Sequence, residues 1–322
     1  MNMKKFGLIG NPVKGSKSPL LFNAAYNGMT QEDGSAYSYD LIEEDGFENA
    51  WEHFLNDYSA INVTAPFKEQ AFAKVLSLAE EGKGLISGPA AKIGATNLVV
   101  KRPDGLEAHN SDFTGIITAI AEAYYPGIVE EFMHEFGERF FVKIHQFFRL
   151  NRDEHFKTIP QALIVGCGGA GKAAAIAAAE MGFETVLMNR SIEKAQAIIN
   201  ANPEYGFMAV PIADFKEAVK ECDLIIYTLP MALPQIAEFS ADDFVMEGCR
   251  KVILEANYRN PSFDEDAEFK IASAEGIYIP GTRWLLYQAL TGYSLMTGLN
   301  PDLSAMLSAL SGPARSCDAQ NA

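Results

Sequence analysis

One stretch of the chain reads Leu163-Ile164-Val165-Gly166-Cys167-Gly168-Gly169-Ala170-Gly171, an apolar run that leads directly into a glycine-rich turn. An alanine-rich segment, expected as a helix to about Met181, follows it. In the Gly-x-Gly-x-x-Gly spacing, the first glycine permits a tight turn, the second lets the backbone approach a pyrophosphate, and the third allows close packing of helix on strand. The alternative is a tight turn that binds nothing. A strand, this turn and a helix in that order favour a dinucleotide-binding unit.

The segments after the turn continue the alternation of strand and helix. Apolar runs at 185–188, 224–227 and 252–255 are typical of short strands, with a helix between them at 192–200. This rhythm predicts a doubly wound, Rossmann-type domain.

The end of the expected strand at 185–188 bears on the choice of cofactor. NAD-binding enzymes usually place Asp or Glu there to bind the ribose 2′-hydroxyl. Here the sequence is Asn189-Arg190-Ser191, with Lys194 one turn on. Arg190 and Lys194 suit a 2′-phosphate, and therefore NADP(H), unless both are only solvated charges at the start of a helix.

The first hundred residues show a second alternating series. Strands are expected at 6–9, 37–41, 60–64, 93–100 and 106–108, and helices at 20–26 and 66–75; two closing helices are expected at 281–297 and 301–310. The predicted fold class is α/β, with an N-terminal α/β substrate domain and a Rossmann-type dinucleotide-binding domain. We expect residues 1–112 and 281–322 to form the first domain and 113–280 the second.

Length and composition agree with this division. The chain has 322 residues, which suggests about two domains. Acidic residues exceed basic ones by 42 − 26 = 16, which argues against a nucleic-acid partner. The cysteines have no metal-ligand spacing, so we expect no metal and a reduced, cytoplasmic setting. No apolar run approaches the roughly 20 residues of a membrane span, and no signal peptide is recognised.

Polar clusters lie at the ends of predicted strands, where open α/β sheets bind ligands. Ser16 and Ser18 can both donate to one carboxylate, although helix capping also explains Ser18. Lys68 falls in the first turn of a helix, where the dipole disfavours a cation, although an ordinary surface lysine is the simpler explanation. Asp112, taken alone, is explained as a helix N-cap. Asn97 lies in an apolar strand and needs partners if it is buried.

Taken in chain order, these segments resemble the shikimate dehydrogenase family over nearly the whole chain. The matching segments are Gly10-Asn11-Pro12 with 16–19, Asn62-Val63-Thr64 with Lys68, 94–97, Asn110-Ser111-Asp112, the glycine turn, Asn189-Arg190-Ser191, and Gly281 with Tyr287-Gln288-Ala289.

The resemblance implies an NADPH-dependent enzyme that reversibly reduces 3-dehydroshikimate to shikimate. Lys68 and Asp112 would be the catalytic pair. Substrate would be bound through its carboxylate by Ser16, Ser18 and Tyr258, and through its ring hydroxyls by Thr64, Asn97 and Gln288. NADP(H) would be bound by Gly166, Gly168, Gly169, Ala170, Gly171, Asn189, Arg190, Ser191, Lys194, Thr228 and Gly281. The expected partner is this small molecule, and the expected assembly is a monomer or a homodimer.

Several positions depart from the family pattern. Gly15 and Phe22 stand where the family usually has His, Ile226-Tyr227 where it has Asn-Ala, and Trp284 where it has Met. These departures leave open a quinate/shikimate or aminoshikimate dehydrogenase, and a catalytically idle NADP or metabolite sensor. The presence of both Lys68 and Asp112 favours the enzyme.

The segment 121–160 is longer than the family's usual link. Within it, apolar residues recur every four positions and predict one helix with an apolar stripe, in a helical insertion around 127–158; they are Phe132, Phe136, Phe140, Ile144 and Phe148. The stripe would either pack on its own domain or, if exposed, form a dimer contact.

Overall fold

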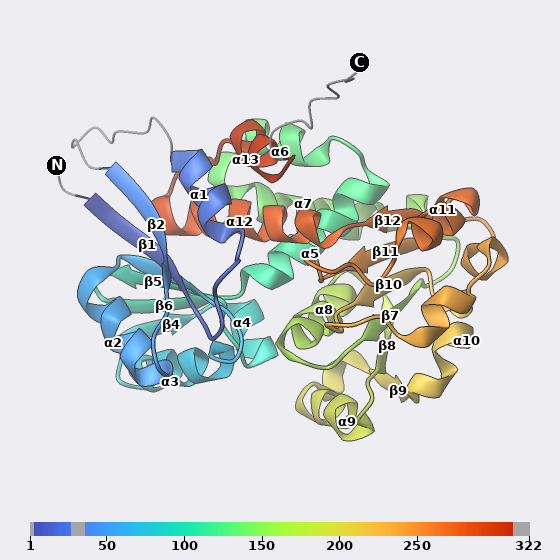
Figure 1. Cartoon of the computed structure of the whole chain (residues 1–322), viewed down its shortest axis with the longest axis horizontal. Coiled ribbons are helices and arrows are strands. Elements are labelled where there is room, and N and C mark those ends of the chain that lie inside the picture. The colour runs from blue at the N-terminus through green and yellow to red at the C-terminus, as the bar shows by residue number, and fades with distance from the viewer. Residues whose placement is uncertain (1–2, 27–35, 312–322) are drawn as a thin grey trace, which may run out of the picture.

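Each half of the chain builds its own six-stranded sheet, and the two sheets form separate lobes (Figure 1). The computed structural model describes residues 3–26 and 36–311. The expected domain ranges extend beyond this part at both ends, because 1–2 and 312–322 lie outside it. The predicted α/β architecture of two sheets is confirmed.

The sheet of the first lobe has the strand order β2-β1-β3-β5-β6-β4. β1 is parallel to its neighbours β2 and β3, and β4 is parallel to β6. β5 is antiparallel to both β3 and β6. α2 and α3 cover one face, and α1 packs on the other. The elements are β1 (Met3–Ile9), α1 (Ser18–Tyr26), β2 (Ala36–Ile42), α2 (Phe47–Asp57), β3 (Ala60–Val63), α3 (Lys68–Glu80), β4 (Gly84–Ile86), α4 (Gly88–Ile93), β5 (Leu98–Arg102) and β6 (Gly105–His109).

The strand expected at 93–100 is wrong in its first half. Ile93 is the last residue of α4, and Gly94 ends that helix in the left-handed conformation. The apolar side chain of Ile93 is buried from a helix rather than from a strand, a difference that a short apolar run does not reveal. β5 begins only at Leu98, so Asn97 lies just before the strand.

The sheet of the second lobe is parallel throughout, in the order β12-β11-β10-β7-β8-β9. α5, α8 and α9 cover one face, and α10 and α11 cover the other, so the predicted doubly wound arrangement is confirmed. The elements are β7 (Gln161–Val165), α8 (Gly169–Glu180), β8 (Glu184–Met188), α9 (Ile192–Ala201), β9 (Met208–Val210), α10 (Phe215–Glu221), β10 (Leu224–Tyr227), β11 (Val252–Glu255), α11 (Glu265–Ser273) and β12 (Ile277–Ile279).

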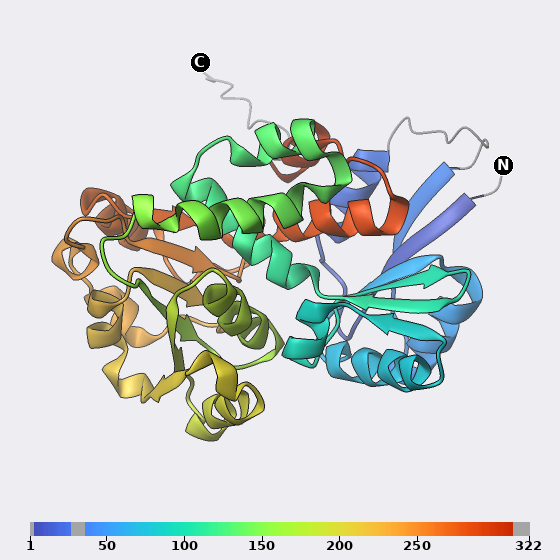
Figure 2. The same ribbon diagram turned by 180° about the vertical axis from the view of Figure 1, so that it is seen from behind.

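Two long helices connect the lobes, α5 (Ser111–Tyr124) and α12 (Gly281–Thr297) (Figures 1 and 2). They cross so closely that a Cβ on Gly115 would lie 2.8 Å from the backbone nitrogen of Gln288. α5 also packs on α8, and α12 packs on α1 and on the short α13 (Leu303–Ser311). Because α5 touches both lobes, the division at 112/113 stays a prediction.

The insertion forms two helices rather than one, α6 (Ile128–Phe136) and α7 (Phe140–Asn151). Gly137, with φ 57°, ends α6, so the expected continuous helix is wrong. Phe140, Ile144 and Phe148 are fully buried in the core that α5 shares. Helix α7 lies against α5 on the side seen in Figure 2. The stripe packs on its own molecule and is not an exposed dimer contact.

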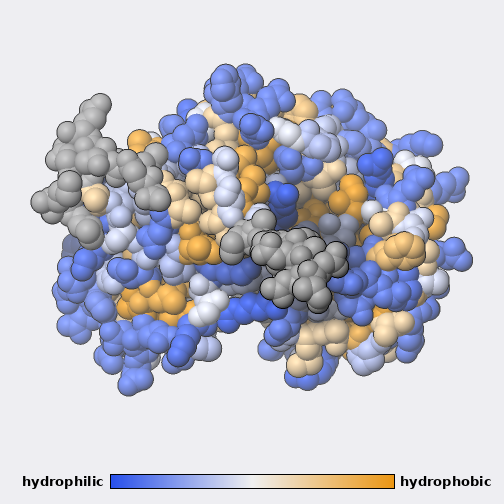
Figure 3. Space-filling view, turned by 45° about the horizontal axis from the view of Figure 1, so that its top comes forward, coloured by the Kyte–Doolittle hydropathy of each residue, from blue (hydrophilic) through white to orange (hydrophobic). Residues whose placement is uncertain are grey.

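Within residues 3–26 and 36–311, no helix has the length and apolar character needed to cross a membrane. On the face shown in Figure 3, hydrophilic residues occupy most of the visible outline, and hydrophobic ones form separate groups between them.

Candidate functional site

A cavity of about 160 Å³ lies in the first lobe, where the ends of β1 and β3 meet α5 and α12. All eight residues predicted to act in catalysis or substrate binding line it: Ser16, Ser18, Thr64, Lys68, Asn97, Asp112, Tyr258 and Gln288. They come from six separate parts of the chain, so the fold brings together what the sequence shows only as scattered clusters.

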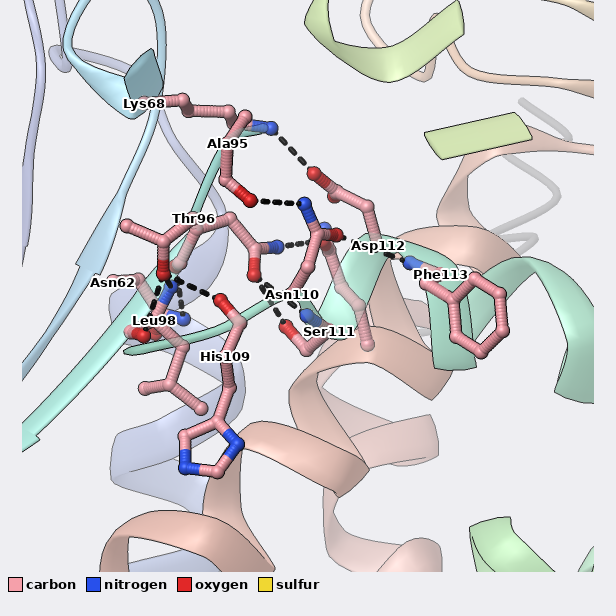
Figure 4. Close-up of polar contacts among 12 residues, drawn as sticks. Asn62, Lys68, Ala95, Thr96, Leu98, His109, Asn110, Ser111, Asp112 and Phe113 are labelled. Carbon is pink, nitrogen blue, oxygen red and sulfur yellow. Dashed lines mark hydrogen bonds and ion pairs between the residues drawn. The ribbon is translucent and has the colours of Figure 1, made fainter. Parts of the chain in front are cut away.

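Lys68 and Asp112 form an ion pair in this cavity, with Nζ 2.5 Å from Oδ2 (Figure 4). Both side chains are largely buried, with 17% and 8% of their surface exposed, so solvent screens the pair only weakly. The explanation of Asp112 as a helix N-cap is wrong, because the side chain of Asn110 caps α5 and accepts the N–H of Phe113. The Asp112 carboxylate is thereby left to face the Lys68 ammonium.

Asn97 finds the partners that its burial requires. Its Oδ1 accepts the N–H of Ser111 at 2.6 Å and the Ser111 hydroxyl at 3.2 Å, and its Nδ2 donates to Gln288 Oε1 at 3.4 Å. The amide of Asn62 donates to the Asn97 carbonyl and accepts the hydroxyl of Tyr39. This network fixes the start of α5, and with it Asp112.

The two serines occupy another end of the cavity. The hydroxyl of Ser16 donates to that of Ser18 at 3.1 Å, and it accepts the N–H of Ser18 at 3.2 Å. Two cations lie near the Tyr258 ring, Lys17 Nζ at 6.0 Å and Arg259 Cζ at 5.9 Å from its centroid. These donors and cations favour an anionic group.

Sequence reasoning missed two polar residues of this cavity, Asn62 and Arg259. Asn62 was visible in the Asn-Val-Thr motif but received no role. Arg259 follows Tyr258, and no motif marks it, because its approach to the loop at Gly15 arises only in the folded chain.

The glycine turn has the geometry that its spacing predicts. A Cβ on Gly171 would lie 1.8 Å from the Gly166 carbonyl oxygen, so α8 can pack this closely only with glycine there. The Thr228 hydroxyl donates to the carbonyls of Val165 and Gly166 and joins β10 to the turn. A Cβ on Gly168 would meet nothing within 4 Å, so the backbone is open to a ligand beside the N-terminus of α8. The turn therefore fits a pyrophosphate.

The residues at the end of β8 divide into two kinds. Asn189 supports the turn, since it accepts the N–H of Cys167 at 3.1 Å and donates to the Ser191 carbonyl at 2.9 Å. Arg190, Ser191 and Lys194 are exposed, and neither cation has an ion-pair partner among the described residues. Burial raises the pKa of the Cys167 thiol to about 11, so this thiol stays protonated at neutral pH.

The first lobe and the glycine turn face each other. A Cβ on Gly169 would lie 3.7 Å from Cδ of Lys68, and Lys172 of α8 pairs with Glu69 of α3 at 2.5 Å. Gly281 lies at the start of α12, where a Cβ would be 2.7 Å from the Ala256 carbonyl oxygen and 2.9 Å from the Tyr258 backbone nitrogen. The ion pair in the cavity thus lies beside the predicted dinucleotide site.

Two of the residues that depart from the family pattern are buried, Tyr227 and Trp284. Tyr227 is buried, and its hydroxyl donates to the Met231 carbonyl and accepts the N–H of Leu233, so it orders the loop after β10. The indole nitrogen of Trp284 is buried and has no hydrogen-bond partner in the described part of the chain. No cluster of three His, Cys, Asp or Glu side chains suited to a metal occurs among the residues with described placement.

Comparisons with known proteins agree with these features. Residues 8–99 match the family described as shikimate dehydrogenase substrate binding domain, and residues 153–253 match shikimate/quinate 5-dehydrogenase. A shikimate dehydrogenase (NADP(+)) from Halobacterium salinarum is 28% identical, over 96% of this chain and 98% of its own. One from Thermus thermophilus is 27% identical, over 94% and 96%.

Solved structures share the fold. The shikimate 5-dehydrogenase of Thermus thermophilus, in complex with NADP(H) and shikimate, has a TM-score of 0.69 at 24% identity, with 96% of this chain and 99% of that chain covered. The quinate dehydrogenase of Corynebacterium glutamicum, in complex with NAD, has a TM-score of 0.71 at 19% identity, with coverage of 97% and 100%.

Proposed function

Because this chain belongs to the shikimate dehydrogenase family, we propose that it is an NADP-dependent shikimate dehydrogenase, which reversibly reduces 3-dehydroshikimate to shikimate. The observation that carries the proposal is the Lys68–Asp112 pair, which lies inside a polar cavity and beside the glycine turn. An idle sensor would have no use for a buried proton donor at that point.

In this proposal Lys68 is the proton donor. NADPH, when bound, supplies a hydride to the substrate carbonyl. Negative charge then builds on the carbonyl oxygen, and the Lys68 ammonium stabilises that charge and gives a proton to the oxygen. Asp112 holds Nζ in place for this transfer, and in the reverse direction Nζ receives the proton.

The other lining residues orient the ring. Ser16, Ser18 and Tyr258 present hydroxyls to the carboxylate at one end. Thr64, Asn97 and Gln288 present polar groups to the ring hydroxyls near Lys68. A ring held at both ends keeps its carbonyl carbon at one position relative to the glycine turn.

For the cofactor we propose NADP(H) held by the glycine turn (Gly166, Gly168, Gly169, Ala170, Gly171), the end of β8 (Asn189, Arg190, Ser191, Lys194), Thr228 and Gly281. The neutral Asn189 does not repel a 2′-phosphate. Arg190 and Lys194 are exposed, have no ion-pair partner among the described residues, and therefore favour binding of a 2′-phosphate.

We also propose a cytoplasmic monomer or homodimer. Two cysteines, Cys167 and Cys222, are free and buried, which suits a reducing compartment. Light scattering gives the assembly directly.

The experiment for the function is absorbance at the NADPH band, with shikimate and then quinate as substrate and NADP⁺ as oxidant. We expect turnover of shikimate, and slower turnover of quinate. Faster turnover of quinate would change the assigned substrate, and no turnover of either would contradict the proposed enzyme.

A further inference from the structure

The geometry points to Arg259 as the ionic partner of the substrate carboxylate, a role that makes it a specificity-determining residue. The inference rests on the proposed function and goes beyond it, because it predicts that this cavity selects a carboxylate over an uncharged group of the same shape. Three observations carry it.

The first is the placement of Arg259. It lies in the loop after β11, next to Tyr258, and it lines the same cavity as Ser16 and Ser18. Asn257 fixes the backbone of this loop, since its Oδ1 accepts the N–H groups of Arg259 and Asn260 and its Nδ2 donates to the Asn260 carbonyl at 2.6 Å. An exposed arginine thus extends from a well-held backbone.

The second is the space above Gly15, the residue before Ser16. A Cβ there would lie 3.7 Å from Cζ and Nη1 of Arg259 and 3.9 Å from Nη2, so all three atoms lie at nearly equal distance from it. The guanidinium therefore lies broadside over this glycine. A side chain longer than a methyl group at position 15 would occupy the place of the guanidinium, and the φ of 84° also favours glycine.

The third is charge. No ion pair or hydrogen bond engages the Arg259 guanidinium among residues 3–26 and 36–311, in a chain with 16 more acidic than basic residues. Arg259 lines the cavity, and Lys17 lies near the same Tyr258 ring, so two cations lie at or close to this end of the cavity. A planar guanidinium matches a carboxylate through two parallel hydrogen bonds, which an ester or amide does not accept equally well.

The test compares Arg259→Ala, Arg259→Lys and the parent, with shikimate and with its uncharged methyl ester. We expect Arg259→Ala to raise the KM for shikimate about ten- to a hundredfold with a much smaller change in kcat, and to leave the KM for the ester nearly unchanged. Arg259→Lys should restore part of the loss, since it keeps the charge. Arg149→Ala, an exposed arginine on α7, is the matched control and should behave as the parent.

An unchanged KM for shikimate in Arg259→Ala, or an equal loss with the ester, would overturn the inference. Calorimetric binding of shikimate separates it from the proposed function. If the parent binds shikimate without turnover and Arg259→Ala binds it at least tenfold more weakly, the inference stands while the proposed function fails. If the parent neither turns over nor binds shikimate, both fail.

Discussion

Lys68 occupies a position that is unfavourable for a cation, the first residue of α3, where the helix dipole is positive. Asp112 offsets that cost from the first turn of α5, where a carboxylate is favoured. Each residue stands at a helix N-terminus, and the two side chains meet across the cavity at 2.5 Å.

Replacing Lys68 by Ala should therefore remove the proposed proton donor and leave the rest of the proposed substrate site in place. We expect kcat to fall at least about a hundredfold, the low end for one acid–base group, while substrate binding weakens much less. Steady-state rates and a binding titration measure the two effects. Lys74→Ala, on the exposed side of the same helix, is the control. A folded Lys68→Ala variant with near-normal turnover would show that Lys68 is not the donor.

Arg190, at the end of β8, is expected to set the preference for NADP⁺ over NAD⁺. Charged hydrogen bonds to a 2′-phosphate should make kcat/KM for NADP⁺ fall about ten- to a hundredfold in Arg190→Ala, with little change for NAD⁺. Both cofactors are measured in the parent and the variant, with Arg149→Ala as control. Equal efficiency with NAD⁺ in the parent would mean that Arg190 is an ordinary surface charge.

At the scale of elements, α7 supports α5 from behind, and so indirectly the site. Phe148 is fully buried between them, whereas Leu150, two residues on, is 84% exposed. Phe148→Ala should lower the free energy of unfolding by about 3–5 kcal/mol, and Leu150→Ala by less than about 0.5 kcal/mol. Urea unfolding measures both. Similar small losses would mean that the insertion is an appendage to the fold.

A buried lysine from elsewhere in the chain, Lys251, contacts the C-terminal end of α10. Lys251 donates to the carbonyls of Val219 and Lys220, and burial lowers its pKa to about 8. A lowered lysine pKa destabilises the folded state while the group is protonated. The penalty, roughly 3 kcal/mol for a shift of this size, is fully present below pH 8 and disappears toward pH 10.5.

The free energy of unfolding of the parent should therefore rise relative to Lys251→Met as pH increases from 8 to 10.5. The variant lacks the hydrogen bonds to the two carbonyls at every pH, so their loss adds a constant to the difference in free energy of unfolding between parent and variant. Only the change of this difference with pH reports the titration of Lys251. Urea unfolding at pH 7, 8, 9 and 10 measures it, with Lys83→Met, an exposed lysine, as control. Curves that stay parallel for parent and Lys251→Met would contradict the lowered pKa.

The sequence predicts long, strongly patterned elements better than short ones. The bounds of α12, Gly281–Thr297, are as expected, because its apolar period is sustained and Pro280 and Gly298 flank it. The sequence places Ile93 in one strand with Leu98, Val99 and Val100, because a single apolar residue fits a helix end as well as a strand. In the site, hydroxyls and charges inside ordered motifs were found, whereas Arg259 was not, because its role depends on a loop that meets Gly15 from far along the chain.

At the scale of the whole molecule, the cleft between the lobes is bridged by ion pairs. Lys172 of α8 pairs with Glu69 of α3, and Lys92 of α4 pairs with Glu180 of α8. In the first pair, Glu69 is the residue next to Lys68, and Lys172 lies near the start of α8, the helix that follows the glycine turn. These ion pairs therefore link the two lobes beside the proposed site.

Reversing one charge of this bridge should open the cleft. Exposed ion pairs contribute about 0.2–1 kcal/mol, so loss of the Glu69–Lys172 pair in Glu69→Lys should shift the equilibrium between open and closed forms by up to about fivefold. Repulsion between the new lysine and Lys172 should increase this shift. We expect the radius of gyration, measured by small-angle X-ray scattering without ligand, to increase in Glu69→Lys and in Lys172→Glu. The double variant restores opposite charges and should return to the parent value. In 1 M salt, where the screening length is about 3 Å, the differences should shrink.

The control for this experiment is Glu48→Lys, which breaks an ion pair with Lys74 inside the first lobe and should leave the radius of gyration unchanged. NADP⁺ with shikimate should compact the parent and both single variants toward one common value, because ligand contacts from the two lobes outweigh one exposed ion pair. If charge reversal at Glu69 changes the radius no more than reversal at Glu48, the lobes are held by α5 and α12 alone. Closure would then be set by the packing of those two helices around Gly115, and substitution there would be the way to change it.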